Sequence, residues 1–202
     1  GQRDGGAADA PVVYRAAPGE VAYIDGGRVV PSGACLPVTD EKILARLLPE
    51  ARKAVRVIDL RAMGIADYGT VGPRGFARSI RPAPLEIFVD GRPMEVARWP
   101  NRGEKPVPLG KVFDKGSTPR TGDFSYRGGV FKYDVDRAER WVDAGDWYVS
   151  GIFNHGYADD IIPVAELDVE AGTIKTALPH LYGFERRGFT TWFALNLLEE
   201  ID

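Results

Sequence analysis

The stretch Leu85–Arg98, LEIFVDGRPMEVAR, carries the strongest local structural signal in the chain. Apolar residues alternate from Leu85 to Val89 and again on the return at Met94 and Val96, as expected for two strands with one face buried. Asp90-Gly91 stands between the two runs, and this dipeptide is typical of a two-residue hairpin turn. The stretch therefore predicts a β-hairpin.

The rest of the chain follows the same β pattern. Short runs rich in β-branched and aromatic residues recur with turn residues between them. A Pro18-Gly19 turn joins the first two runs, and a turn closed by Gly64 follows the third. Strands are predicted at Val12–Ala16, Val21–Gly27, Val55–Val57, Asp146–Phe153, Ile161–Leu167, Thr173–Ala177 and Phe189–Leu195. Spaced short strands indicate an all-β sandwich or barrel.

One helix interrupts this pattern. The sequence TDEKILARLLP offers Thr39 or Asp40 as the helix cap and Pro49 as its end. Between them, apolar residues at positions 43, 44, 47 and 48 fall on one face. We expect one short helix in an otherwise β domain.

Composition narrows the classes of function. The 202 residues are 44% hydrophobic and 27% charged, enough for a proper core. The net charge of −3 gives no electrostatic case for binding nucleic acid or an anionic membrane. No apolar run approaches the roughly 20 residues that a membrane span needs. We therefore expect neither nucleic acid nor membrane as a partner.

The sequence contains few residues that could bind a metal ion and no motif that predicts a bound cofactor. The chain has two histidines, His155 and His180, and one cysteine, Cys35, whereas a zinc site wants three or four such ligands at close spacing. Cys35 is expected to be a small packed residue. No phosphate-binding loop, dinucleotide fingerprint or serine nucleophile turn occurs. No metal, cofactor or catalytic residue is assigned.

Aromatic and planar polar side chains are the remaining candidates for a site. Aromatic rings can stack on the C–H faces of sugars, and planar polar groups match their hydroxyls. Trp147 and Trp192 lie on predicted strands and are expected to pack in the core, whereas Trp99 precedes Pro100 and suits either role. The candidate carbohydrate contacts are Arg98, Trp99, Asn101, Asn154, His155, Tyr157, Asp159, Asp160 and Tyr182.

Several segments resemble a known family. They are APVVYRAAPGE (10–20), PAPLEIFVDGRPMEVARWPNRG (82–103), GVFKYDVDRAERWVDAGDWYVSGIFNHGYADD with its continuation (129–176), HLYGF (180–184) and FALNLLEEID (193–202). In their residues and order they are similar to bacterial right-handed parallel β-helix proteins related to glycoside hydrolase family 141. Those proteins carry a β-sandwich-like domain inserted near the start of the β-helix.

The resemblance implies a domain plan and a setting. Residues 1–35 would form a first β-helix coil, 36–80 a connector with the short helix, 81–192 the inserted β domain and 193–202 the return to the β-helix. Catalytic acids of such proteins lie on later coils, so none is carried over. The chain would be a non-catalytic accessory domain of a secreted or periplasmic polysaccharide-degrading protein. Its partners would be a polysaccharide or oligosaccharide and the remainder of the β-helix.

Three alternatives stay open at this point. A free-standing carbohydrate-binding module would need exposed coplanar rings, with Trp99 and either Tyr157 or Tyr182 as candidates. A small glycoside hydrolase would use Asp159 or Asp160 together with His155. A purely structural or dimerisation role would need a large exposed apolar patch.

Overall fold

A computed structural model describes residues 5–74 and 76–201. The first four residues of the expected first coil, Gly75 of the expected connector and Asp202 of the expected return therefore lie outside the described residues. The chain divides into two compact units, residues 1–34 and 35–202.

The first unit contains no strand among its described residues, 5–34. A single bridge joins Ala7 to Ala10, and a short 3₁₀ turn, η1 (Ser32–Ala34), closes the unit. The predicted turn at Pro18-Gly19 is confirmed, because Glu20 N–H donates to the carbonyl of Ala17 at 3.0 Å. The two strands predicted on either side of this turn are wrong, and the physical reason is that an isolated pair of strands is marginal without a third strand or a face to pack on.

The predicted helix is confirmed as α1 (Glu41–Arg46), in the second unit. Asp40 is its cap, since its carboxylate accepts hydrogen bonds from the backbone N–H groups of Lys42 and Ile43 at 2.8 and 3.4 Å. The helix ends before Pro49, and Leu47 just after it is buried. Beside it, β1 (Leu36–Pro37) pairs with β2 (Arg56–Val57), which the predicted turn at Gly64 follows.

The predicted hairpin is confirmed as β3 (Phe88–Val89) and β4 (Arg92–Pro93). Asp90 and Gly91 both have positive φ, 50° and 73°, as this class of two-residue turn requires. The ladder is short and forms a separate two-stranded sheet. Its side chains are exposed.

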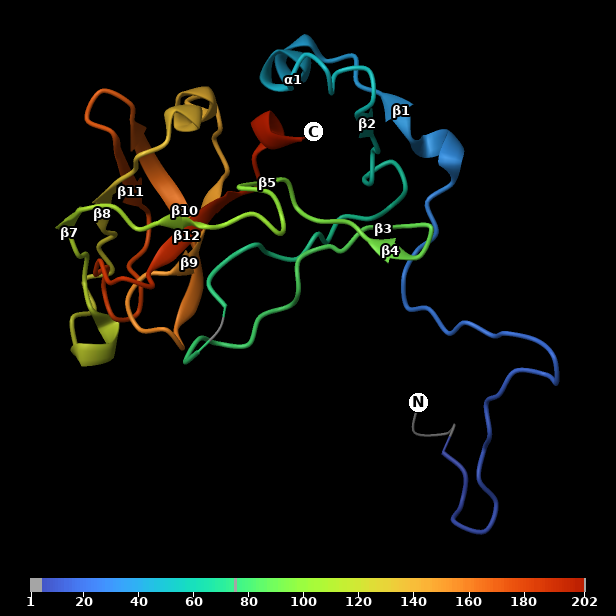
Figure 1. The fold of residues 1–202 in the computed structure, drawn as a ribbon. Helices are drawn as coiled ribbons and strands as arrows, with labels where there is room; N and C mark the ends of the chain where they lie inside the picture. The colour runs from blue at the N-terminus through green and yellow to red at the C-terminus, as the bar shows by residue number, and fades with distance from the viewer. Residues whose placement is uncertain (1–4, 75, 202) are drawn as a thin grey trace. The chain divides into compact units, whose positions relative to one another are not determined.

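A second, larger sheet holds the remaining strands, and all of its pairs are antiparallel. The strand order is β5-β12-β9-β10-β11-β8-β7, with β6 also on β12 (Figure 1). Among the described strands, β5 and β7 do not pair, so the sheet is open and the domain is all-β and sandwich-like, as predicted. The strands are β5 (Arg98–Trp99), β6 (Val107–Pro108), β7 (Val112–Asp114), β8 (Val130–Lys132), β9 (Tyr148–Ile152), β10 (Asp159–Asp168), β11 (Thr173–Thr176) and β12 (Thr191–Leu195).

The longest strand, β10, joins two halves of this sheet. Its first half, Asp159–Pro163, pairs with β9, and its second half, Val164–Asp168, pairs with β11. The register shifts between Val164 and Glu166, where a bulge interrupts the ladder. Strands that change partners at a bulge form the corners of sandwiches. The corner sets the β12–β9 half and the β11–β8–β7 half around one core.

Aromatic rings from both halves fill that core. Phe131 on β8 lies 5.9 Å from the ring of Trp192 on β12, and both are fully buried. Trp141, in the 3₁₀ segment η3 (Asp136–Trp141), packs between Trp147 and Trp192 at 5.4 and 6.5 Å. The prediction that Trp147 and Trp192 are packing residues is confirmed.

Strand β12 runs across the boundary expected at residues 192/193. All five of its residues pair with β9, in which Gly151 lies opposite Trp192. A Cβ atom at Gly151 would lie 2.1 Å from the carbonyl oxygen of Thr191. The antiparallel sheet therefore includes the first three residues of the expected return segment.

Two phenylalanines on neighbouring strands test this account of the core. Phe131→Ala removes a fully buried ring and is expected to lower the free energy of unfolding by about 3–5 kcal/mol. Phe113→Ala on β7 removes a ring that is 55% exposed and should cost under about 1 kcal/mol. Urea denaturation of both variants measures the difference. Equal losses would contradict the assignment of Phe131 to the shared core.

Candidate functional site

The nine candidate contacts fall into two groups at opposite ends of β9. The first group is Arg98 and Trp99 on β5, with Asn101 two residues further on. Arg98 and Trp99 pair with Leu195 and Ala194 of β12, which lie opposite Tyr148 and Val149 at the start of β9. The other group follows the far end of β9, beyond Ile152. It contains Asn154, His155, Tyr157, Asp159, Asp160 and Tyr182, the last of which is tied to Asn154.

The first group is a structural corner. The Trp99 ring packs on Trp141 at 5.8 Å, and the peptide bond between Trp99 and Pro100 is cis. The guanidinium of Arg98 lies 3.7 Å above the ring of Phe193, and its Nε donates to the carbonyl of Pro100 at 2.9 Å. Asn101 accepts the N–H of Glu104 and donates its own N–H to that side chain. These residues are therefore engaged with the fold, and Trp99 is half-buried against Trp141.

The second group forms an exposed aromatic cluster, which we define as Phe76, His155, Tyr157, Tyr182 and Phe189. The imidazole of His155 stacks on Tyr157 at 5.3 Å with the planes 2° apart. Tyr182 stands perpendicular to both rings, at 4.7 Å from His155 and 6.1 Å from Tyr157. Phe76 and Tyr157 pack in a T-shaped arrangement with their ring centroids 5.2 Å apart, and Phe189 lies beside Gly156.

The rings of the aromatic cluster remain open to solvent. Tyr157 is 59% exposed, Phe189 50% and Phe76 47%. A hydrogen bond with Tyr182 raises the pKa of Tyr157, so its phenol is neutral at ordinary pH and can both donate and accept. These exposed rings, held against one another, make the cluster the candidate binding surface of this end of the sheet.

Buried polar side chains hold the cluster from beneath. Asn154 donates through Nδ2 to the carbonyls of Tyr182 and Gly183, at 3.1 and 3.2 Å. Burial lowers the pKa of His180, whose ring nitrogens lie 3.0 Å from the Gly183 carbonyl and 3.1 Å from the Ala158 carbonyl. Asn154 and His180 therefore position the backbone that carries Tyr157 and Tyr182, and neither side chain is exposed.

Asp159 and Asp160 are neighbours on β10 and point to opposite faces of the strand. Asp159 is exposed, whereas Asp160 is buried and forms an ion pair with Arg78. Burial raises the pKa of Asp160 to about 6 against the opposing attraction of Arg78. The two carboxylates do not face a common space, so the pair that hydrolysis by two carboxylates requires is not formed by them.

Arginines and phenylalanines that the sequence analysis did not select complete the surroundings of the cluster. Arg78 holds the Phe76 segment to Asp160 and to the carbonyl of Pro179. Arg120 donates its backbone N–H to the carbonyl of Leu181 at 3.0 Å, beside Tyr182. Arg187 lies two residues before Phe189. These residues come from separate loops without periodicity, so no local pattern marks them.

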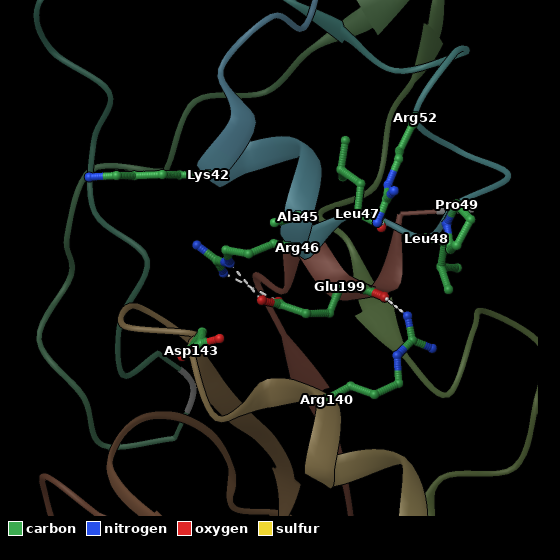
Figure 2. Close-up of a pocket in the computed structure, with 10 residues that line it drawn as sticks. All are labelled: Lys42, Ala45, Arg46, Leu47, Leu48, Pro49, Arg52, Arg140, Asp143 and Glu199. Atoms are coloured by element: carbon green, nitrogen blue, oxygen red, sulfur yellow. Dashed lines mark hydrogen bonds and ion pairs between the residues drawn. The ribbon is translucent and has the colours of Figure 1, made fainter.

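A separate open pocket of about 600 Å³ lies beside α1 (Figure 2). Arg46 reaches the buried carboxylate of Glu199 through two hydrogen bonds of 2.6 and 3.2 Å, and Arg140 donates to the Glu199 carbonyl at 2.8 Å. Figure 2 shows the two arginines approaching Glu199 from different sides. These hydrogen bonds attach η4 (Leu198–Glu200) to α1 through Arg46 and to η3 through Arg140. The pocket is lined by Lys42, Ala45, Arg46, Leu47, Leu48, Pro49, Arg52, Arg140, Asp143 and Glu199.

Metal ligands do not gather in the described part of the chain. Within residues 5–74 and 76–201, no group of three or more His, Cys, Asp or Glu side chains could hold an ion. Cys35 is a free, exposed thiol, so the expectation that it is packed is wrong; it precedes β1, whose two side chains are also exposed. In the same ranges, no helix has the length and apolar character to cross a membrane.

Comparison of the chain with protein-family models, with curated proteins and with solved structures finds no match.

The buried carboxyl of Asp160 predicts a pH effect on stability. A pKa of about 6 in place of 3.8 means that the folded protein holds this proton more tightly than the unfolded chain. Stability from this group is therefore greatest at low pH and falls by a total of about 3 kcal/mol as pH rises from below about 4 to above about 6. Asp160→Asn should remove this component, whereas Asp159→Asn, on the exposed face, should follow the wild type.

Denaturation curves of the three proteins at pH 4, 5, 6 and 7 measure the effect. The informative quantity is the difference in unfolding free energy between Asp160→Asn and wild type at each pH, since other carboxyl groups cancel in it. A difference that stays constant with pH would contradict the raised pKa.

Proposed function

We propose that this chain is a non-catalytic, glycan-binding β domain of a secreted or periplasmic polysaccharide-degrading protein. The aromatic cluster is its glycan-contacting surface. Its partners are a polysaccharide and the remainder of a β-helix chain.

The observation that carries the proposal is the exposed Tyr157 ring, held in place on three sides. His155 stacks on it, Tyr182 stands perpendicular to it, and Phe76 packs against it in a T-shaped pair. A flat apolar ring with a polar hydroxyl suits the C–H face and hydroxyl groups of a sugar. Because the ring is already ordered, little conformational freedom is lost when a ligand binds.

The support for a non-catalytic role comes from the carboxylates. Asp160 is buried against Arg78 and Asp159 lies on the opposite face of β10, so His155 has no facing carboxylate pair beside it. This disfavours the small glycoside hydrolase. A free-standing carbohydrate-binding module would use the same cluster, without Trp99.

The resemblance to β-helix proteins supplies the wider setting. The most specific parts of the resemblance are Ala97–Asn101 and Asn196–Asp202. The first residue of the second segment contacts the first segment, since the N–H of Asn196 donates to the carbonyl of Ala97 at 2.8 Å. Segments that are similar to those of the family thus serve the packing of the β domain. This pattern fits an accessory domain whose catalytic residues lie elsewhere.

A second candidate function, a dimerisation surface, rests on the β3–β4 hairpin. Six apolar side chains on or beside it are 39–58% exposed: Leu85, Ile87, Phe88, Val89, Met94 and Val96. Exposed apolar side chains gathered in this way favour association. Sedimentation at increasing concentration would then show a dimer for the wild type and a monomer for Phe88→Lys. A monomer for both proteins would rule out this candidate.

Substitution at the centre of the aromatic cluster tests glycan binding. Tyr157→Ala removes the most exposed ring, and affinity for the bound polysaccharide should fall about tenfold or more, equivalent to about 1.4 kcal/mol. Phe124→Ala is the matched control, because that ring is 63% exposed and contacts Tyr126 outside the cluster. Affinity electrophoresis against a panel of plant and algal polysaccharides, followed by calorimetry, measures both variants.

The outcomes separate the hypotheses. Loss of binding in Tyr157→Ala alone supports the proposal. Equal binding by wild type and Tyr157→Ala places the site elsewhere, and no binding of any polysaccharide by the wild type overturns the glycan-binding function.

A further inference from the structure

The aromatic cluster is flanked by arginines from separate loops. We infer that it takes an acidic sugar, a uronic acid residue within a polysaccharide, whose carboxylate is bound by Arg120 and Arg187. This inference rests on the proposed glycan-binding function and names the class of glycan.

Arg120 lies next to Tyr182. It belongs to the 3₁₀ turn η2 (Pro119–Thr121), and its backbone N–H donates to the carbonyl of Leu181 at 3.0 Å. The residue is exposed, and no described residue forms a hydrogen bond or ion pair with its guanidinium. All five of its N–H donors are therefore available to a ligand.

Arg187 lies on the loop that carries Phe189. Its backbone N–H donates to Oγ of Thr190 at 2.8 Å, which fixes the loop that carries Phe189. One guanidinium nitrogen pairs with Glu185 at 2.8 Å, while Nε is buried without a hydrogen-bond partner among the described residues. A ligand would therefore meet the outer nitrogens of this guanidinium, whose side chain is 35% exposed, and not Nε.

Charges around Tyr157 favour an anion. The hydrogen bond with Tyr182 raises the pKa of Tyr157, and the positive charges of Arg120 and Arg187 oppose this rise. The nearby carboxylates are partly engaged: Asp160 with Arg78 and Glu185 with Arg187. Asp159 is exposed at the start of β10. Two positive groups thus border the ring on a chain whose net charge is −3.

Guanidinium groups suit a carboxylate in particular. Their planar fork can donate two parallel hydrogen bonds to its two oxygens, and these charge-assisted bonds are stronger than bonds to neutral hydroxyls. A uronic acid combines such a carboxylate with a C–H face that can stack on Tyr157. A neutral sugar would use the ring and leave the arginines solvated.

The test compares acidic polysaccharides with their carboxyl-reduced forms. Polygalacturonate, alginate and glucuronoxylan are each offered to the whole chain before and after reduction of the carboxylates to primary alcohols, which keeps the sugar ring and removes the charge. At least one acidic polymer should bind about tenfold more tightly than its reduced form, and the difference should shrink at high salt.

Two variants assign the effect to the arginines. The double variant Arg120→Gln/Arg187→Gln should lose the preference for the acidic polymer while still binding the reduced form. Arg92→Gln, on the exposed hairpin, is the matched control and should keep the preference. Thermal unfolding and the retained binding of the reduced polymer show that the double variant is folded.

Each other result is decisive. Equal binding of acidic and reduced polymers by the wild type would overturn this inference and leave glycan binding standing. A preference that survives in the double variant would overturn the assignment to Arg120 and Arg187. Binding of no polymer would overturn both this inference and the proposed function.

Discussion

The bend in β10 is the constraint on which the rest of the domain depends. A ten-residue strand pairs with β9 through its first half and with β11 through its second, and the bulge between Val164 and Glu166 lets it do both. Without this change of partner, the two halves of the sheet would lie side by side, and Phe131 and Trp192 would not meet. The aromatic core therefore follows from one irregularity in one strand.

The corner at Ala97–Asn101 and the segment Asn196–Glu200 both contact the same aromatic core, through Trp141. Glu200 is buried, accepts a hydrogen bond from the indole of Trp141 at 2.7 Å and pairs with Arg137. Glu199 binds Arg46 of α1. Buried carboxylates need such partners, because an unpaired buried charge is strongly destabilising. This explains why two acidic residues follow a run of apolar ones at the end of the sheet.

The aromatic cluster lies at the opposite end of β9 from that corner, and its support is also polar. Asn154 and His180 bind backbone carbonyls beneath it, and Arg78 ties the Phe76 segment to Asp160. Each polar group below the rings thus fixes a backbone segment above. The surface is rigid where it presents Tyr157, which is the property that a binding platform needs.

Local chemistry in the sequence was enough to predict several elements. The Asp90-Gly91 dipeptide predicted the hairpin turn, and Asp40 predicted the start of α1. Runs of β-branched and aromatic residues predicted β9, β10, β11 and β12. These signals act over a few neighbouring residues, so no tertiary contact is needed to read them. The short strands β5 to β8 gave no such signal, because two or three residues carry no measurable period.

The sequence by itself therefore determined the all-β class, the helix and the main strands, and it selected His155, Tyr157 and Tyr182 as residues of suitable chemistry. Only the tertiary structure decided that Trp99 and Arg98 belong to a packed corner and that Asp159 and Asp160 face apart. It alone brought Phe76, Arg120, Arg187 and Phe189 to the same surface. The physical reason is that these residues lie on separate loops, whose meeting depends on how the strands pair and bend.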